Sequence, residues 1–228
     1  MIEEIYGSDM KEKEKEDLVN FYNDFLKVYS SIIEEKLVPK KDKNGKNLPT
    51  DLSDLKVNIK YKFSGESQRS WKEKDIFDLI KFGNPVKEYK KLVFLLANIF
   101  AMWSLMNSEH YKKAEEMDAF QANLKGYLLQ PHVAQIFSIL RTIGFGYQSK
   151  YKNGSKFNST WKKLFEDPSN IRNNLVQIKT GEGKSITLAV VSMIFALNGF
   201  EVKCACYSKY LSMRDYESFE PMFRELGL

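Results

Sequence analysis

Cysteine and histidine are scarce in this chain of 228 residues, which contains two of each. Cys204 and Cys206 alternate along an apolar segment, so in a strand they would share one face as small buried side chains. A C-x-C pair without a second pair is a poor zinc site, and two thiols cannot build a disulfide framework. The sequence therefore argues against a zinc centre or a disulfide-rich secreted domain, and it fits a reducing cytoplasm.

Long apolar runs are also missing. The most apolar stretch, Leu92–Met106, spans 15 residues and is interrupted by Asn98 and Ser104. A bilayer crossing requires roughly 20 apolar residues, so this stretch predicts a buried helix. The first residues show no basic region followed by an apolar core, so we expect no secretory signal. The expected location is the cytoplasm, at most peripheral to a membrane.

Charge is unevenly distributed along the chain. Residues 1–36 carry a net charge of −5, which leaves +10 on the remainder and +5 on the whole chain. An acidic leading helix beside a basic body predicts good solubility or intramolecular docking, with a mild preference for anionic partners.

The first half of the chain, residues 1–126, predicts a mainly helical region. Residues 9–37 carry an apolar stripe at helical spacing, with Asp9 as the candidate N-cap. Residues at about 39–50 predict a polar loop, and the alternation in Leu55–Phe63 is compatible with a short strand. Further helices are expected over residues 92–106, 111–124 and 131–143.

A glycine-rich turn lies between a strand-like and a helix-like segment. Asn174–Ile178 is short and apolar, which predicts a buried parallel strand. Residues 180–183 read Thr-Gly-Glu-Gly, and from Lys184 the apolar pattern is helical up to Asn198-Gly199. Residues 201–207 predict a second strand. This order predicts an α/β fold, with a partial P-loop (RecA-like) parallel β-α-β domain after the helical region.

The turn has the composition of a phosphate-binding loop. Gly181 and Gly183 can adopt positive φ and let the backbone approach a phosphate closely. The following helix would direct its unpaired N–H groups and its positive dipole end at the same place. Lys184 is expected to neutralise the β- and γ-phosphates of ATP, and the Ser185 hydroxyl to coordinate Mg²⁺. The candidate nucleotide-binding residues of the loop are Thr180, Gly181, Glu182, Gly183, Lys184 and Ser185.

The loop departs from the strict G-x-x-x-x-G-K-[ST] pattern, because Ile178 stands in place of the first glycine. The alternative is an ordinary strand–turn–helix connection with a surface lysine. The apolar segments on both sides favour the phosphate-binding interpretation.

With its flanks included, this part of the chain resembles SecA, the preprotein translocase ATPase, and its divergent relatives. Residues 179–185 match the loop Lys-Thr-Gly-Glu-Gly-Lys-[Thr/Ser] of that family. Ser208–Asp215 is similar to the family segment Asn-Asp-Tyr-Leu-Ala-x-Arg-Asp, and Phe223–Leu228 to the Phe-Leu-Gly-Leu end of the following helix. The resemblance covers residues 127–228 and implies a SecA-like or DEAD-like nucleotide-binding domain that is present only in part.

The resemblance also implies an adenine contact upstream of the loop. Leu129–Gln135 is similar to the adenine-reading segment of SecA, which makes Gln135 the candidate, since a carboxamide can both donate and accept hydrogen bonds. Val133 stands where the family often has Asp, and the 49 residues between Gln135 and Lys184 exceed the separation in bacterial SecA. We therefore expect an insertion at about residues 144–173. Its aromatic and lysine residues could bind nucleic acid, but its turn-rich tripeptides favour a surface loop.

In the intact family, the resemblance implies that ATP hydrolysis drives a polypeptide through a membrane channel. Hydrolysis also requires a carboxylate pair and an arginine from a second lobe, and the sequence contains no Asp-Glu-x-Asp or Asp-Glu-x-His segment. We therefore expect an ATP- and Mg²⁺-binding motor segment, completed by the remainder of the motor or by a partner chain. ATPase activity of this chain stays open. The alternatives are a DEAD-box-like helicase segment, which would bind nucleic acid, and a non-hydrolysing nucleotide-binding or interaction module.

Overall fold

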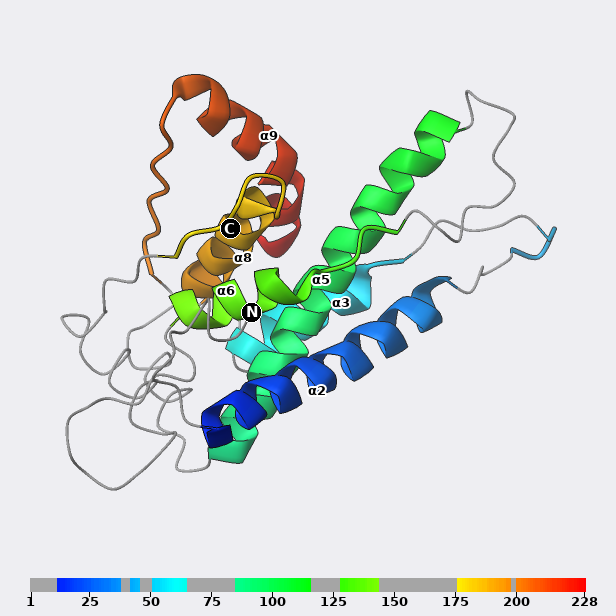
Figure 1. The fold of residues 1–228 in the computed structure, drawn as a ribbon. Coiled ribbons are helices and arrows are strands. Elements are labelled where there is room, and N and C mark those ends of the chain that lie inside the picture. Colours follow the sequence, from blue (N-terminus) through cyan, green and yellow to red (C-terminus); the bar gives the residue numbers. More distant parts are fainter. Residues whose placement is uncertain are drawn as a thin grey trace.

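A computed structural model describes seven stretches of the chain, residues 12–37, 42–45, 51–64, 85–115, 128–143, 176–197 and 200–228. Six α-helices occur in them (Figure 1): α2 (Glu12–Leu37), α3 (Ser53–Ser64), α5 (Pro85–Glu115), α6 (Val133–Thr142), α8 (Lys184–Leu197) and α9 (Lys209–Leu226). The expected insertion at 144–173 lies outside these residues, as do the Asp9 cap and residues 116–124 of an expected helix.

The described residues contain no strand, so the prediction of an α/β fold with a β-α-β unit is wrong. Residues 176–179 and 201–206, where strands were expected, are neither helical nor paired in a ladder. A strand is defined by hydrogen bonds to a neighbouring strand, and an apolar sequence pattern does not supply that neighbour.

The prediction of a strand at Leu55–Phe63 is also wrong, because these residues lie within α3. Burial shows why. Leu55 and Ile59, four positions apart, are 1% and 0% exposed, whereas Val57 between them is 48% exposed. A strand would have placed all three on one face, while a helix turns the middle residue away.

Helices α2 and α5 pack against each other and α3 packs against α5 (Figure 1), and their apolar residues belong to one core that also includes residues of α6, α8 and α9. The apolar run predicted as a buried helix lies within α5 and supplies fully buried residues such as Leu96 and Phe100. From α2, Phe21 and Phe25 are also fully buried. The Phe25 and Phe100 rings meet edge to face, with centroids 5.9 Å apart. The apolar stripe expected in residues 9–37 thus forms one wall of this core.

A second group of helices contains the predicted loop. The apolar helix α8 packs against α6 on one side and α9 on another. Helix α6 also contacts α2, where Phe137 meets the Tyr22 ring edge to face with centroids 5.9 Å apart. Because α6 contacts both groups, the position of the loop is tied to the α2–α5 core. None of the described helices is both long enough and apolar enough to cross a membrane.

Tyr29 and Ser104 form a buried hydrogen bond between α2 and α5. Their hydroxyl oxygens are 2.9 Å apart. Burial raises the pKa of Tyr29, an effect that the Ser104 hydrogen bond opposes, so the phenol stays neutral near pH 7.

Tyr29→Phe removes this hydrogen bond while keeping the ring. We expect a loss of about 1 kcal/mol in the free energy of unfolding, measured by urea denaturation near neutral pH. The double variant Tyr29→Phe/Ser104→Ala should lose less than the two single losses combined, because it leaves neither hydroxyl without its partner. Strictly additive losses would show that the bond contributes nothing.

Candidate nucleotide-binding site

The loop has the backbone shape of a tight turn that runs directly into a helix. Gly181 and Gly183 adopt φ of +87° and +78°, and the Glu182 N–H donates to the Lys179 carbonyl at 3.3 Å. Helix α8 begins at Lys184, where the pattern predicted it. The first N–H groups of a helix have no acceptor within the helix, so they stay available at this end. The loop therefore lets a ligand approach the backbone closely, next to the unpaired N–H donors and the positive dipole end of α8.

Gln135 of α6 holds the loop from the side. Its Oε1 accepts from the His132 N–H at 3.0 Å as part of a capping box, and its Nε2 donates to the Glu182 carbonyl at 3.2 Å. A Cβ added at Gly183 would lie 2.2 Å from that Nε2. The predicted adenine contact is therefore in direct contact with the predicted phosphate loop, across the 47 positions that separate Gln135 from Glu182 in sequence.

Lys184 bends back over its own loop. Its side chain is exposed, and Nζ donates to the carbonyl of Ile178 at 3.2 Å. Ile178 is the residue that replaces the first glycine of the strict motif. An ammonium group has three donors, so this contact leaves capacity for phosphate oxygens.

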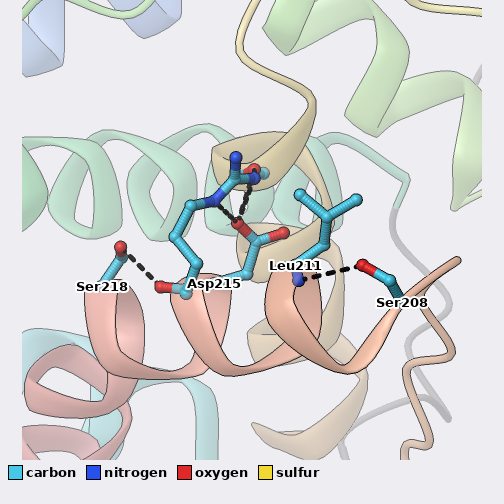
Figure 2. Close-up of polar contacts among 6 residues, drawn as sticks. Ser208, Leu211, Asp215 and Ser218 are labelled. Atoms are coloured by element: carbon cyan, nitrogen blue, oxygen red, sulfur yellow. Dashed lines mark hydrogen bonds and ion pairs between the residues drawn. The ribbon is translucent and has the colours of Figure 1, made fainter.

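Ser185 is joined to α9 by a small polar cluster. Its Oγ donates to Asp215 Oδ1 at 3.0 Å, and it lies 3.4 Å from Arg214 Nη2. Arg214 also donates to the same carboxylate oxygen, from Nε at 3.0 Å and from Nη2 at 2.6 Å, and Figure 2 shows these bonds converging on Asp215. The hydrogen bond and the charge of Asp215 raise the pKa of Arg214, so the guanidinium stays fully charged.

Both ends of helix α9, which carries Arg214 and Asp215, are capped. The Ser208 hydroxyl caps the first turn by accepting from the Leu211 N–H at 3.3 Å (Figure 2), and Gly227 closes the helix in the left-handed conformation with φ of +68°. Asp215 then lies about two turns into the helix, beside Ser185.

A groove of about 470 Å³ runs between α8 and α9 from this cluster. Its lining includes Ser185, Asp215, Ala189, Phe219 and Cys204. The prediction that both cysteines are buried in a strand is wrong: Cys204 is exposed, with its Sγ 3.1 Å from Ser192 Oγ, and Cys206 is partly exposed. Without a ladder partner, residues 201–206 do not enter a sheet interior that would cover their thiols.

Sequence reasoning identified the loop but missed the contact between Ser185 and Asp215. In the sequence, Arg214 and Asp215 stand out only as the end of the segment Ser208–Asp215 that resembles SecA. In the described part of the chain, no group of three or more His, Cys, Asp or Glu side chains is arranged for a metal ion. Ser185 and Asp215 place a hydroxyl oxygen and a carboxylate oxygen 3.0 Å apart beside the loop.

Comparison with known proteins shows similarity to SecA proteins. Residues 169–228 match the family model of the SecA DEAD-like domain. The chain is 27% identical over 144 residues to protein translocase subunit SecA 2 of Clostridioides difficile, a match that covers 62% of this chain and 18% of that protein. It is 23% identical over 150 residues to protein translocase subunit SecA of Clostridium kluyveri, covering 62% and 16% respectively.

A shorter match has higher identity, 37% over 54 residues of protein translocase subunit SecA 3 of Magnetococcus marinus, which covers 24% of this chain and 8% of that protein. The chain thus spans less than a fifth of the length of these relatives. No solved structure matches it. The chain is a distant SecA-like relative whose C-terminal residues correspond to the SecA DEAD-like domain.

Proposed function

We propose that this chain binds ATP together with Mg²⁺ through Thr180–Ser185 and Gln135. The observation that carries the proposal is the turn in which Gly181 and Gly183 adopt positive φ directly before α8. Such a turn places backbone N–H groups around a polyanion without an obstructing Cβ. The residues fit the ligand, because Lys184 is exposed and Ser185 lines an open groove.

Each residue has a distinct task in this proposal. Lys184 leaves the Ile178 carbonyl and donates to phosphate oxygens, which are stronger acceptors because they are charged. Ser185 supplies a hydroxyl oxygen to the cation that accompanies ATP. Gln135 has one Nε2 hydrogen and one Oε1 lone pair beyond its present bonds, which suffices for the N6 and N7 edge of adenine.

The similarity to SecA proteins extends the proposal to the intact system. By that similarity, the nucleotide site belongs to a motor that couples ATP hydrolysis to polypeptide translocation at a membrane channel. The motor would work in the cytoplasm, peripheral to the membrane, with the rest of its machinery in a longer chain or a partner. For this chain we propose nucleotide binding and leave turnover to the complete motor.

Lys184→Ala tests the nucleotide site. Titration of the full chain with a fluorescent ATP analogue in Mg²⁺ should show at least about tenfold weaker binding, since a charge-assisted hydrogen bond contributes roughly 1.5–3 kcal/mol. Lys203→Ala is the matched control, because Lys203 is an exposed lysine paired with Glu201 outside the loop. Equal affinity of wild type and Lys184→Ala would refute the site, as would an equal loss in Lys203→Ala.

A further inference from the structure

The contact between Ser185 and Asp215 gives the nucleotide site a component from α9. The two residues are 30 positions apart, and the hydrogen bonds from Ser185 and Arg214 to the carboxylate converge on one oxygen, Oδ1. Asp215 is partly buried, with 23% of its side chain exposed, whereas the Arg214 side chain is 51% exposed. The carboxylate is therefore held from two sides, by the hydroxyl of the loop and by the guanidinium of its own helix.

The direction of the hydrogen bond determines what the hydroxyl can do. Ser185 donates its proton to Asp215, so its oxygen lone pairs are left to accept. A carboxylate that accepts a hydrogen bond from a metal-binding group fixes the orientation of that group and makes its oxygen a better ligand. The contact from Arg214 Nη2 at 3.4 Å is longer than a good hydrogen bond, so it competes only weakly for the same oxygen.

We infer that Asp215 is a positioning residue for Mg²⁺-bound ATP, holding the Ser185 hydroxyl with its lone pairs available to the cation. This inference rests on the proposed nucleotide site. Arg214 supports the arrangement because it is paired with Asp215, which offsets the repulsion that an unpaired guanidinium would exert on a cation. Both Ser185 and Asp215 line the groove between α8 and α9, so the cluster is open to a ligand.

A purely structural role is the competing explanation, in which the cluster only ties α8 to α9. The two roles differ in one measurable quantity, the factor by which Mg²⁺ strengthens ATP binding. A positioning residue changes that factor, whereas a tie between helices changes stability or affects binding equally with and without the cation.

The experiment is a titration of the full chain with ATP, in excess Mg²⁺ and separately in EDTA. In wild type, Mg²⁺ should strengthen binding. In Asp215→Asn that gain should shrink by about tenfold, the lower end of the effect expected when a supporting carboxylate is lost, while affinity in EDTA stays within about twofold. Glu217→Gln is the matched control, because Glu217 is an exposed carboxylate on the same helix that does not line the groove. It should retain the full gain.

The outcomes separate the two proposals. Absence of ATP binding by wild type, with or without Mg²⁺, would remove the nucleotide site itself. Normal binding with an undiminished Mg²⁺ gain in Asp215→Asn would overturn the positioning role alone, as would equal losses in Mg²⁺ and EDTA. If Asp215→Asn does not fold, Ser185→Ala and Asp215→Glu replace it. Ser185→Ala should abolish the gain, and Asp215→Glu should keep part of it. A full gain in Ser185→Ala would overturn the inference.

Discussion

Gly183→Ala is expected to weaken ATP binding by about 100-fold, more than any other single loop substitution considered. The residue has φ of +78°, where an alanine is strained, and its new Cβ would lie 2.2 Å from Gln135 Nε2 and 3.2 Å from Ile186 Cγ2. Strain of this kind costs roughly 1–3 kcal/mol, and each 1.4 kcal/mol is a factor of about ten in affinity. The loop must either change its turn, which moves the backbone N–H groups that would surround the phosphates, or displace the flexible end of Gln135 from the Glu182 carbonyl, which removes the predicted adenine contact from the loop.

Two further variants separate backbone strain from collision. Gly181 has a similar φ of +87°, but a Cβ there meets nothing within 4 Å, so Gly181→Ala reports strain alone. Gly183→Ala/Gln135→Ala removes the obstructing side chain and should recover part of the affinity relative to Gly183→Ala. Gly45→Ala, at φ of +80° in a turn outside the site, is the control for general strain and should bind ATP normally.

Affinities are to be compared by calorimetric titration in Mg²⁺, and the folding of each variant checked by circular dichroism. If Gly183→Ala binds ATP as wild type does, the loop does not act as a cradle for phosphate. If it binds as Gly181→Ala does, the contact with Gln135 plays no part.

Local features of the sequence were sufficient to predict the loop and the start of α8. A turn with two glycines followed by an apolar helical pattern depends only on neighbouring residues, so Gly181, Gly183 and Lys184 could be placed without tertiary information. The buried helix at Leu92–Met106 was predicted for the same reason, since a run this apolar has few alternatives to burial.

The strands could not be predicted in this way, because their existence depends on partners elsewhere in the chain. Leu55 and Ile59 are four positions apart, a spacing that places them on one face both in a strand, where every second residue shares a face, and in a helix, where every fourth residue does. Only the exposure of Val57 distinguishes them. At residues 201–206 the alternation was present, but the described residues supply no neighbouring strand.

The contact between Asp215 and Ser185 could be found only from the structure. Nothing in the sequence relates Asp215 to Ser185, which precedes it by 30 positions, and an Arg-Asp pair on a helix usually forms a simple surface ion pair. Packing of α9 against α8 brings the carboxylate to the hydroxyl. Site residues contributed by a neighbouring helix are therefore the part of such a site that sequence patterns leave unassigned.

Phe100→Ala is expected to produce the largest loss of stability in the α2–α5 core. The side chain is fully buried, and its ring meets Phe25 and Trp103 edge to face at centroid distances of 5.9 and 6.1 Å. Truncation removes the buried ring and leaves a cavity that the two long helices cannot close, which costs roughly 3–5 kcal/mol. Urea denaturation followed by circular dichroism measures the loss.

Tyr216→Ala, an aromatic truncation at a side chain 63% exposed, should stay within about 0.5 kcal/mol of wild type. Phe100→Leu, which fills most of the space, serves if the alanine variant does not fold, and it should fall between the two. An unfolding midpoint for Phe100→Leu above that of wild type, or losses as large in Tyr216→Ala, would show that this ring does not stabilise the core.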